Sequence, residues 1–209
     1  MAYGVASNIA LGALLVSLLS VPATADERFI AKLHPLNADK IGTSANGTAT
    51  LEIADGTLSV VIDLAGLPTG LMHLQHFHGF PDGKDAVCPG ATADTNGDGY
   101  IDLIETEPLA GTTMVPFHAH PATLEIPSDS YPQADKDGKA HYQKGELVAD
   151  LEKALKDKFK APVLALDKRV IFVHGVKSTP PLPSTVKSLP GVPAEVTLPI
   201  ACGEIEPVK

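Results

Sequence analysis

Two histidines separated by one residue, His76 and His78, are the first candidates for chemistry in this chain. Side chains two residues apart on a β-strand project from the same face. The two imidazoles would then share one rigid surface, which suits half of a copper or zinc site. Paired histidines are also common on protein surfaces, so the pair alone leaves both interpretations open. His73 is expected on the opposite face, as a structural hydrogen-bonding group.

A second candidate is the segment 94–105, DTNGDGYIDLIE, which has the spacing of an EF-hand calcium loop. Gly99 falls at the sharp turn of that loop, and oxygen-bearing residues fall at the coordinating positions. The expected calcium ligands are Asp94, Asn96, Asp98, Tyr100 through its carbonyl, Asp102 and Glu105. Pro89 and Pro108 lie close on either side, so a pair of long flanking helices is not expected. The ion would stiffen the loop; the alternative is an unoccupied turn rich in Asp and Asn.

The chain has two cysteines, Cys88 and Cys202. In an exported protein an even number of cysteines usually means a disulfide, and here one pairing is possible. It would close a loop of more than a hundred residues, worth up to about 4.7 kcal/mol in the chain-entropy model. The alternative is two thiolate metal ligands, although neither cysteine belongs to a CxxC pair.

The N-terminal residues indicate export. Residues 9–19, IALGALLVSLL, are apolar but shorter than the roughly 20 residues that span a bilayer. The small-x-small pattern of residues 23–25 then predicts a signal peptide over residues 1–25 and cleavage near Ala25. The mature chain would be periplasmic or extracellular. No Lys or Arg precedes the apolar run, and a buried helix or a membrane anchor is the alternative.

The composition narrows the function classes. The net charge of −9 falls entirely after residue 25, and such a surface repels nucleic acid and anionic lipid. No second apolar stretch is long enough to cross a membrane. No nucleophilic triad, phosphate loop or pair of acid/base carboxylates supports hydrolase or transferase chemistry. Eighteen Gly, eighteen Pro and no Trp favour short strands joined by turns, in one domain over residues 26–209.

These candidates must be positioned by strands. Apolar residues that alternate with polar ones predict strands, with a hairpin at Asp55-Gly56. The predicted strands are 29–34, 47–53, 57–64, 71–78, 169–174 and 196–205. Apolar residues at three- and four-residue spacing predict one helix over 146–159, and residues 79–93 and 178–193 read as loops. The pattern indicates an all-β antiparallel protein with long loop insertions and one short helix.

Three segments resemble the copper/zinc superoxide dismutase family. Residues 70–78 (GLMHLQHFH) are similar to its His-x-His segment with one residue inserted, and 170–175 (VIFVHG) to its later strand with another ligand histidine. Residues 198–203 (LPIACG) are similar to its closing segment, whose cysteine bonds to one in the loop where Cys88 lies. The resemblance implies a Greek-key antiparallel β-sandwich or barrel. It also implies copper ligands at His76, His78 and His174.

The resemblance requires a further ligand between Cys88 and the helix. His118 and His120 are the candidates, besides His141, and the alternative is that they are solvated loop histidines. The family's zinc-binding histidine series is missing, so a full dismutase-type zinc site is not expected. Pro199 stands where the family has its active-site arginine. Superoxide is an anion that needs a positive field, so copper binding is better supported than superoxide dismutation.

Four segments also resemble the chordin-type (CHRD) domain, namely 29–33, 46–51, 58–61 and 76–79. Three functions therefore remain open. The first is an exported copper-binding protein of superoxide dismutase-like fold with a structural calcium loop. The second is a zinc-independent copper superoxide dismutase. The third is a non-enzymatic CHRD-type module with a protein partner, in which the histidines are structural.

Overall fold

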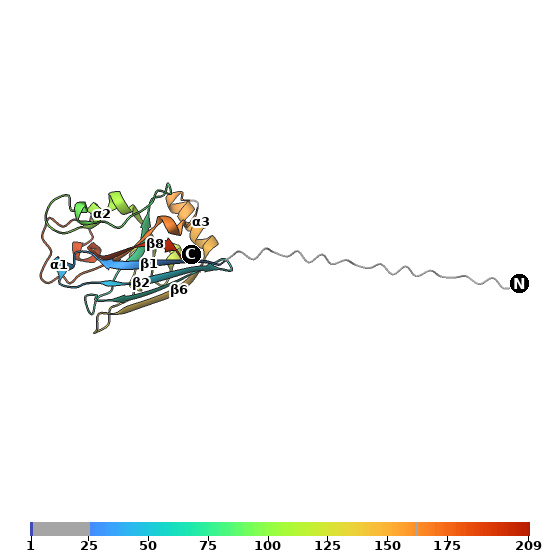
Figure 1. Ribbon diagram of the computed structural model, residues 1–209, viewed down its shortest axis with the longest axis horizontal. Coiled ribbons are helices and arrows are strands. Elements are labelled where there is room, and N and C mark those ends of the chain that lie inside the picture. Colours follow the sequence, from blue (N-terminus) through green and yellow to red (C-terminus); the bar gives the residue numbers. More distant parts are fainter. Residues whose placement is uncertain (2–25, 162) are drawn as a thin grey trace.

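The computed structural model of the protein describes Met1 and residues 26–161 and 163–209. Apart from Met1, the predicted signal peptide lies outside the described residues. Eight strands dominate the described part of the chain (Figure 1). They are β1 (Glu27–Pro35), β2 (Asn46–Ala54), β3 (Thr57–Ala65), β4 (Gln75–Gly79), β5 (Thr112–Pro116), β6 (Ala140–Leu147), β7 (Val170–His174) and β8 (Pro199–Pro207). The all-β fold class is confirmed.

The helices are short. They are α1 (Ala38–Ile41), α2 (Leu103–Ala110), α3 (Val148–Phe159) and α4 (Ala194–Thr197), with 3₁₀ turns at Ala91–Ala93, Pro121–Thr123 and Leu166–Lys168. Figure 1 shows α2 and α3 on one side of the molecule and β6 on the other. Among the described residues, no helix combines the length and the apolar character needed to cross a membrane.

All eight strands belong to one curled sheet in the order β5-β4-β7-β8-β1-β2-β3-β6, and every pairing is antiparallel. Strands β1, β2 and β3 are neighbours in the sheet; β2 and β3 form a hairpin, and residues 36–45, which include α1, connect β1 to β2. The connections from β3 to β4, from β5 to β6 and from β6 to β7 instead cross to distant positions in the sheet, as in Greek-key folds. These crossings place β4 beside β7, although about ninety residues separate them in sequence.

The β2–β3 hairpin is the one predicted at Asp55-Gly56. Both residues have positive φ, 48° and 72°, as a two-residue turn of the primed type requires. This turn fixes Ala54 opposite Thr57. Buried and exposed side chains then alternate along β3, so its apolar residues face the inside of the curled sheet.

Strands β4 and β7 differ from this pattern because every residue in them is buried. Their inner face joins the main hydrophobic core, which includes Phe77 and Ile171. Their outer face is covered by the loops that follow β4, where a second apolar cluster forms around Phe172, Val170 and Cys202. The candidate histidines therefore lie under loops on the outer face of the sheet, not inside the main core.

Several predicted boundaries need correction. The strand expected over 71–78 begins only at Gln75, and before it Met72 makes just an isolated β-bridge to Gln133. The helix expected from residue 146 begins at Val148, because Glu146 and Leu147 pair with β3 as the end of β6. The last strand begins at Pro199, after the helical turn α4. The sequence reading also missed β5 and β6, and it expected one helix where α1, α2 and α4 form in addition. Edge strand β6, AHYQKGEL, has too few apolar residues to show alternation.

Candidate metal centre

Three histidines come together on the outer face of β4 and β7. His76 and His78 lie on β4, and His174 ends β7. His76 pairs with Phe172, two residues before His174, so all of these side chains share one face. The ring centroid of His76 lies 4.8 Å from that of His78 and 4.7 Å from that of His174. One ring nitrogen of each histidine lies within 4.8 Å of the others, and this is the only such group of candidate ligands in the described residues.

Two β-bulges lie beside these histidines. The register of β4 against β5 shifts between Phe77 and His78, and that of β7 against β8 shifts between Val173 and His174. A bulge adds one residue on one strand and changes the direction of nearby side chains, and it often lies beside a functional site. The extra residues are Met114 on β5 and Ile200 on β8, so each bulge lies on the neighbouring strand, opposite His78 and opposite His174.

Hydrogen bonds identify which ring nitrogen carries the proton in His174 and His78. The Nδ1–H of His174 donates to the carbonyl oxygen of Thr197 at 2.7 Å, which leaves its Nε2 unprotonated. The Nδ1–H of His78 donates to the carbonyl oxygen of Gly111 at 3.2 Å, and its Nε2 accepts from the Thr113 hydroxyl at 3.1 Å. Both rings therefore turn Nε2 away from the backbone as a free or exchangeable ligand atom.

Two buried nitrogens at this centre lack any hydrogen-bond partner among the described residues. They are Nδ1 of His76 and Nε2 of His174. A buried polar atom without a partner is costly, and such atoms are rare unless a ligand or water satisfies them. Both atoms belong to the same cluster, so one bound cation would satisfy both. The donor set therefore fits a metal ion.

Burial keeps these imidazoles neutral. It lowers the pKa of His78 to about 3 and that of His174 to about 4, and the hydrogen bond from His174 to Thr197 only partly offsets this. Burial also lowers the pKa of His76 well below its usual value, and the neighbouring rings of His174 and His78 lower it further. Neutral imidazole is the form that binds a metal, so protons do not compete for these atoms at neutral pH.

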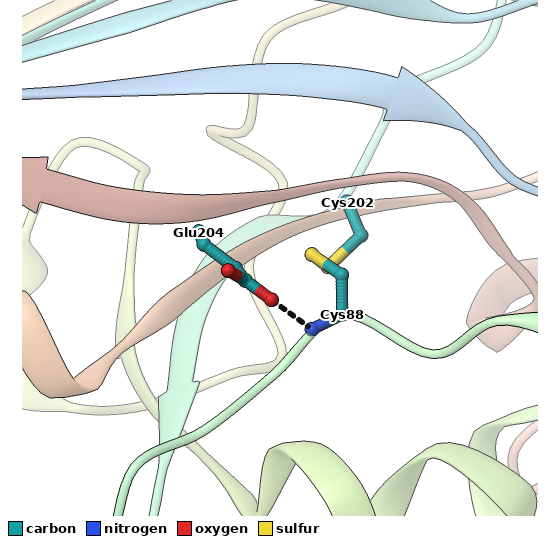
Figure 2. Close-up of a disulfide and its surroundings, with 3 residues drawn as sticks. All are labelled: Cys88, Cys202 and Glu204. Atoms are coloured by element: carbon teal, nitrogen blue, oxygen red, sulfur yellow. Dashed lines mark hydrogen bonds between the residues drawn. A yellow bond between two sulfur atoms is a disulfide. The ribbon is translucent and has the colours of Figure 1, made fainter.

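A disulfide fastens the loop that follows β4. Cys88, in the loop after β4, is bonded to Cys202 on β8, as the sequence predicts (Figure 2). The backbone N–H of Cys88 also donates to the carboxylate of Glu204 at 3.1 Å (Figure 2). Cys202 pairs across the sheet with Phe172, whose ring lies 4.8 Å from that of His78 and 5.6 Å from that of His174. The disulfide therefore holds the loop against the apolar floor of the centre.

His73 supports the centre from the turn before β4. Its ring is buried, and its two nitrogens lie 3.0 Å from the carbonyl oxygen of His174 and 2.9 Å from that of Pro68. These contacts agree with the structural hydrogen-bonding role expected from the sequence. They tie the backbone of His174 to the turn that leads into the His-x-His strand.

The other candidate histidines are not brought to the cluster. His118 donates from Nε2 to the carbonyl oxygen of Glu125 at 2.7 Å and accepts the backbone N–H of His120 at Nδ1, so both of its nitrogens are engaged. His120 is exposed. His141 lies on β6 and is bonded to Asp63 at 2.7 Å. The group that meets His78 instead is Thr113, which sequence reasoning missed because nothing in its residue type marks it.

The calcium-loop residues form a connected set of turns that leads into α2. Asp94 accepts the backbone N–H groups of Gly97, Asp98 and Gly99. Asp102 caps α2, and the Glu105 carboxylate accepts the backbone N–H of Asp102 in return. As expected, long flanking helices are absent from this described segment, since a 3₁₀ turn precedes it and the eight-residue α2 follows. The acidic groups do not gather as closely as the histidines, and calcium binding stays a prediction.

Comparison with known proteins finds similarity among solved structures but not among protein families or curated sequences. No protein-family model matches the sequence, so the CHRD resemblance gains no support, and no curated protein matches it either. Among solved structures, the copper/zinc superoxide dismutase from Brucella abortus is similar at 21% identity and a TM-score of 0.42. The match covers 86% of this chain and 100% of that one.

Proposed function

We propose that the three-histidine centre binds a copper ion and that the protein is an exported copper-binding protein. The observation that carries this is the convergence of three buried, neutral imidazoles, with one ring nitrogen of each within 4.8 Å of the others. Imidazole ligands suit copper and zinc, and a given site generally binds Cu²⁺ more tightly than Zn²⁺. When bound, copper would supply one-electron chemistry, whereas the protein holds the three rings and excludes water from their buried faces.

Export is supported by two separate features. Residues 1–25 carry the pattern of a cleavable signal peptide. The Cys88–Cys202 disulfide is of the kind that persists in oxidising compartments. We therefore place copper binding in the periplasm or outside the cell.

Superoxide dismutation is the second candidate function, and the charges near the centre favour it less. The chain has two arginines, Arg28 and Arg169. Arg28 is exposed and bonded to Glu52, and Arg169 is buried and donates to the carbonyl oxygens of Leu164 and Phe80. Neither is free to attract an anion, and the net charge of −9 opposes superoxide.

We also propose a structural calcium ion at Asp94 to Glu105. All six coordinating positions of an EF-hand loop carry suitable oxygen ligands. The ion would stiffen the segment that enters α2, next to the loop that the disulfide holds.

Copper titration tests the main proposal. Equilibrium dialysis of the protein, followed by elemental analysis, should give one tightly bound copper per chain. His76→Ala and His174→Ala should each abolish this binding, and His141→Ala is the matched control because His141 is exposed and bonded to Asp63. Tight binding that survives both buried changes would exclude the proposed centre. A superoxide assay of the copper-loaded protein separates the two functions, with activity no greater than that of the metal-free protein expected.

A further inference from the structure

A pocket of about 270 Å³ opens beside the histidine centre. Its lining includes His78 and Thr113, which are joined by the hydrogen bond from the Thr113 hydroxyl to Nε2 of His78. The pocket therefore lies against a residue that we assign as a copper ligand. Its volume lies just below the usual range for small-molecule sites, about 300–1,000 Å³, so only a small molecule would fit.

The walls of this pocket are apolar and come from separate segments of the chain. Leu103 and Ile104 belong to α2, Phe159 ends α3, Leu189 lies in the proline-rich loop, and Ile126 follows the Pro121–Thr123 turn. Ile104 is 43% exposed and Leu189 is 53% exposed. An apolar ligand would cover both side chains, and this burial would favour binding.

The charged side chains of the pocket favour neither an anionic nor a cationic ligand. Glu107 and Lys158 also line it, both are exposed, and their charges are opposite. The Lys158 ammonium already donates to the carbonyl oxygen of Leu124 and lies 5.3 Å from the centre of the Phe159 ring. The pocket thus offers an apolar body, a polar end and no net charge.

We infer that this pocket binds a small, uncharged molecule with an apolar body and one donor atom, which is directed at the His78–Thr113 end. One part of this inference rests on the proposed function, because the donor atom of the ligand can reach a metal only if copper is bound at the histidine centre. The apolar part of the binding depends on the walls alone and does not require copper.

Two probes of known chemistry test this, imidazole and 4-phenylimidazole. Both present the same donor nitrogen, and only the second has an apolar body that the walls can bury. We expect 4-phenylimidazole to bind the copper-loaded protein at least tenfold more tightly than imidazole, as followed by the visible spectrum of Cu²⁺. Equal affinities for the two probes would overturn the inference even if copper binding is normal.

Matched variants locate the site. Leu189→Ser should remove most of the preference for 4-phenylimidazole without changing copper binding. Leu147→Ser is the control, since Leu147 is equally exposed, at 53%, but lies on β6 and not in the pocket. A preference that persists in Leu189→Ser would contradict the assignment. If the protein binds no copper, the proposed function fails, but the pocket can still be tested. Ligand-observed NMR of the metal-free protein with 4-phenylimidazole would then measure binding to the apolar walls, and no detectable binding would refute the proposed pocket.

Discussion

The Nδ1–H of His174 donates a hydrogen bond of 2.7 Å to the carbonyl oxygen of Thr197, the last residue of α4. This contact fixes the ring so that its other nitrogen, Nε2, points to the cluster without a partner. Hydrogen bonds of this kind orient metal-binding histidines and hold them in the required tautomer. The proline-rich loop and the short helix that follows it thus help to set the geometry of the centre.

The Thr113 hydroxyl should compete with the metal for Nε2 of His78, because it donates to that atom at 3.1 Å. Thr113→Val removes the hydroxyl and keeps the shape, so we expect copper affinity to rise about three- to tenfold, the usual worth of one hydrogen bond. Competition with a copper chelator measures this. Thr112→Val serves as the control, and an unchanged or weaker affinity in Thr113→Val would show that the hydroxyl does not oppose metal binding.

Acid should destabilise the metal-free protein through the buried histidines. Their pKa is lower in the folded state than in the unfolded chain, so the unfolded state binds more protons at pH values between the two. The free energy of unfolding should therefore fall as pH drops below about 6.5, and the loss for His174 would reach about 3 kcal/mol once the pH is below its folded pKa of about 4.

Urea unfolding at pH 7, 6, 5 and 4 measures this fall. His174→Asn should flatten the curve. Identical pH dependence in the wild type and His174→Asn would show that the ring does not stay neutral.

Copper affinity should also change little between pH 7 and pH 5. The pKa values of about 3 for His78 and about 4 for His174 mean that protons compete for these nitrogens only in stronger acid. Chelator competition at several pH values checks this, after correction for the chelator's own protonation. A tenfold loss of affinity for each pH unit in that range would indicate ligands with ordinary histidine pKa values.

Loss of the disulfide should weaken both the fold and the centre. Cys88 and Cys202 are 114 residues apart, and removal of a native disulfide of this kind typically costs about 2–5 kcal/mol. The Cys88→Ser, Cys202→Ala double variant should unfold at lower urea and bind copper less tightly, because the loop after β4 is no longer fixed beside Phe172. Copper affinity equal to that of the wild type would show that the loop is held without the disulfide.

Calcium should raise the melting temperature of the metal-free protein, since a ligand that binds only the folded state stabilises it. Asp94→Asn and Asp98→Asn should each remove this effect. Asp63→Asn is the control, because Asp63 lies on β3 outside the loop. Equal stabilisation of all four proteins by calcium would place the ion elsewhere.

The alternation of apolar and polar residues predicted the clearest strands, whereas the grouping of His174 with His76 and His78 came from the resemblance to copper/zinc superoxide dismutases. The short-range signals were sufficient for the hairpin at Asp55-Gly56, because its turn requires positive φ. Contacts made by backbone carbonyls could not be predicted. The Gly111 and Thr197 carbonyls that orient the rings and the bulges beside His78 and His174 depend on the tertiary arrangement of loops, which residue types do not encode locally.

X-ray absorption of the copper-loaded protein tests the central claim most directly. Three imidazole nitrogens at about 2.0 Å should surround the metal, and His76→Ala should eliminate this signature while His141→Ala preserves it. A copper ion bound mainly by carboxylate oxygens, or a spectrum that is the same in His76→Ala, would contradict the assignment of the three-histidine centre as the copper site.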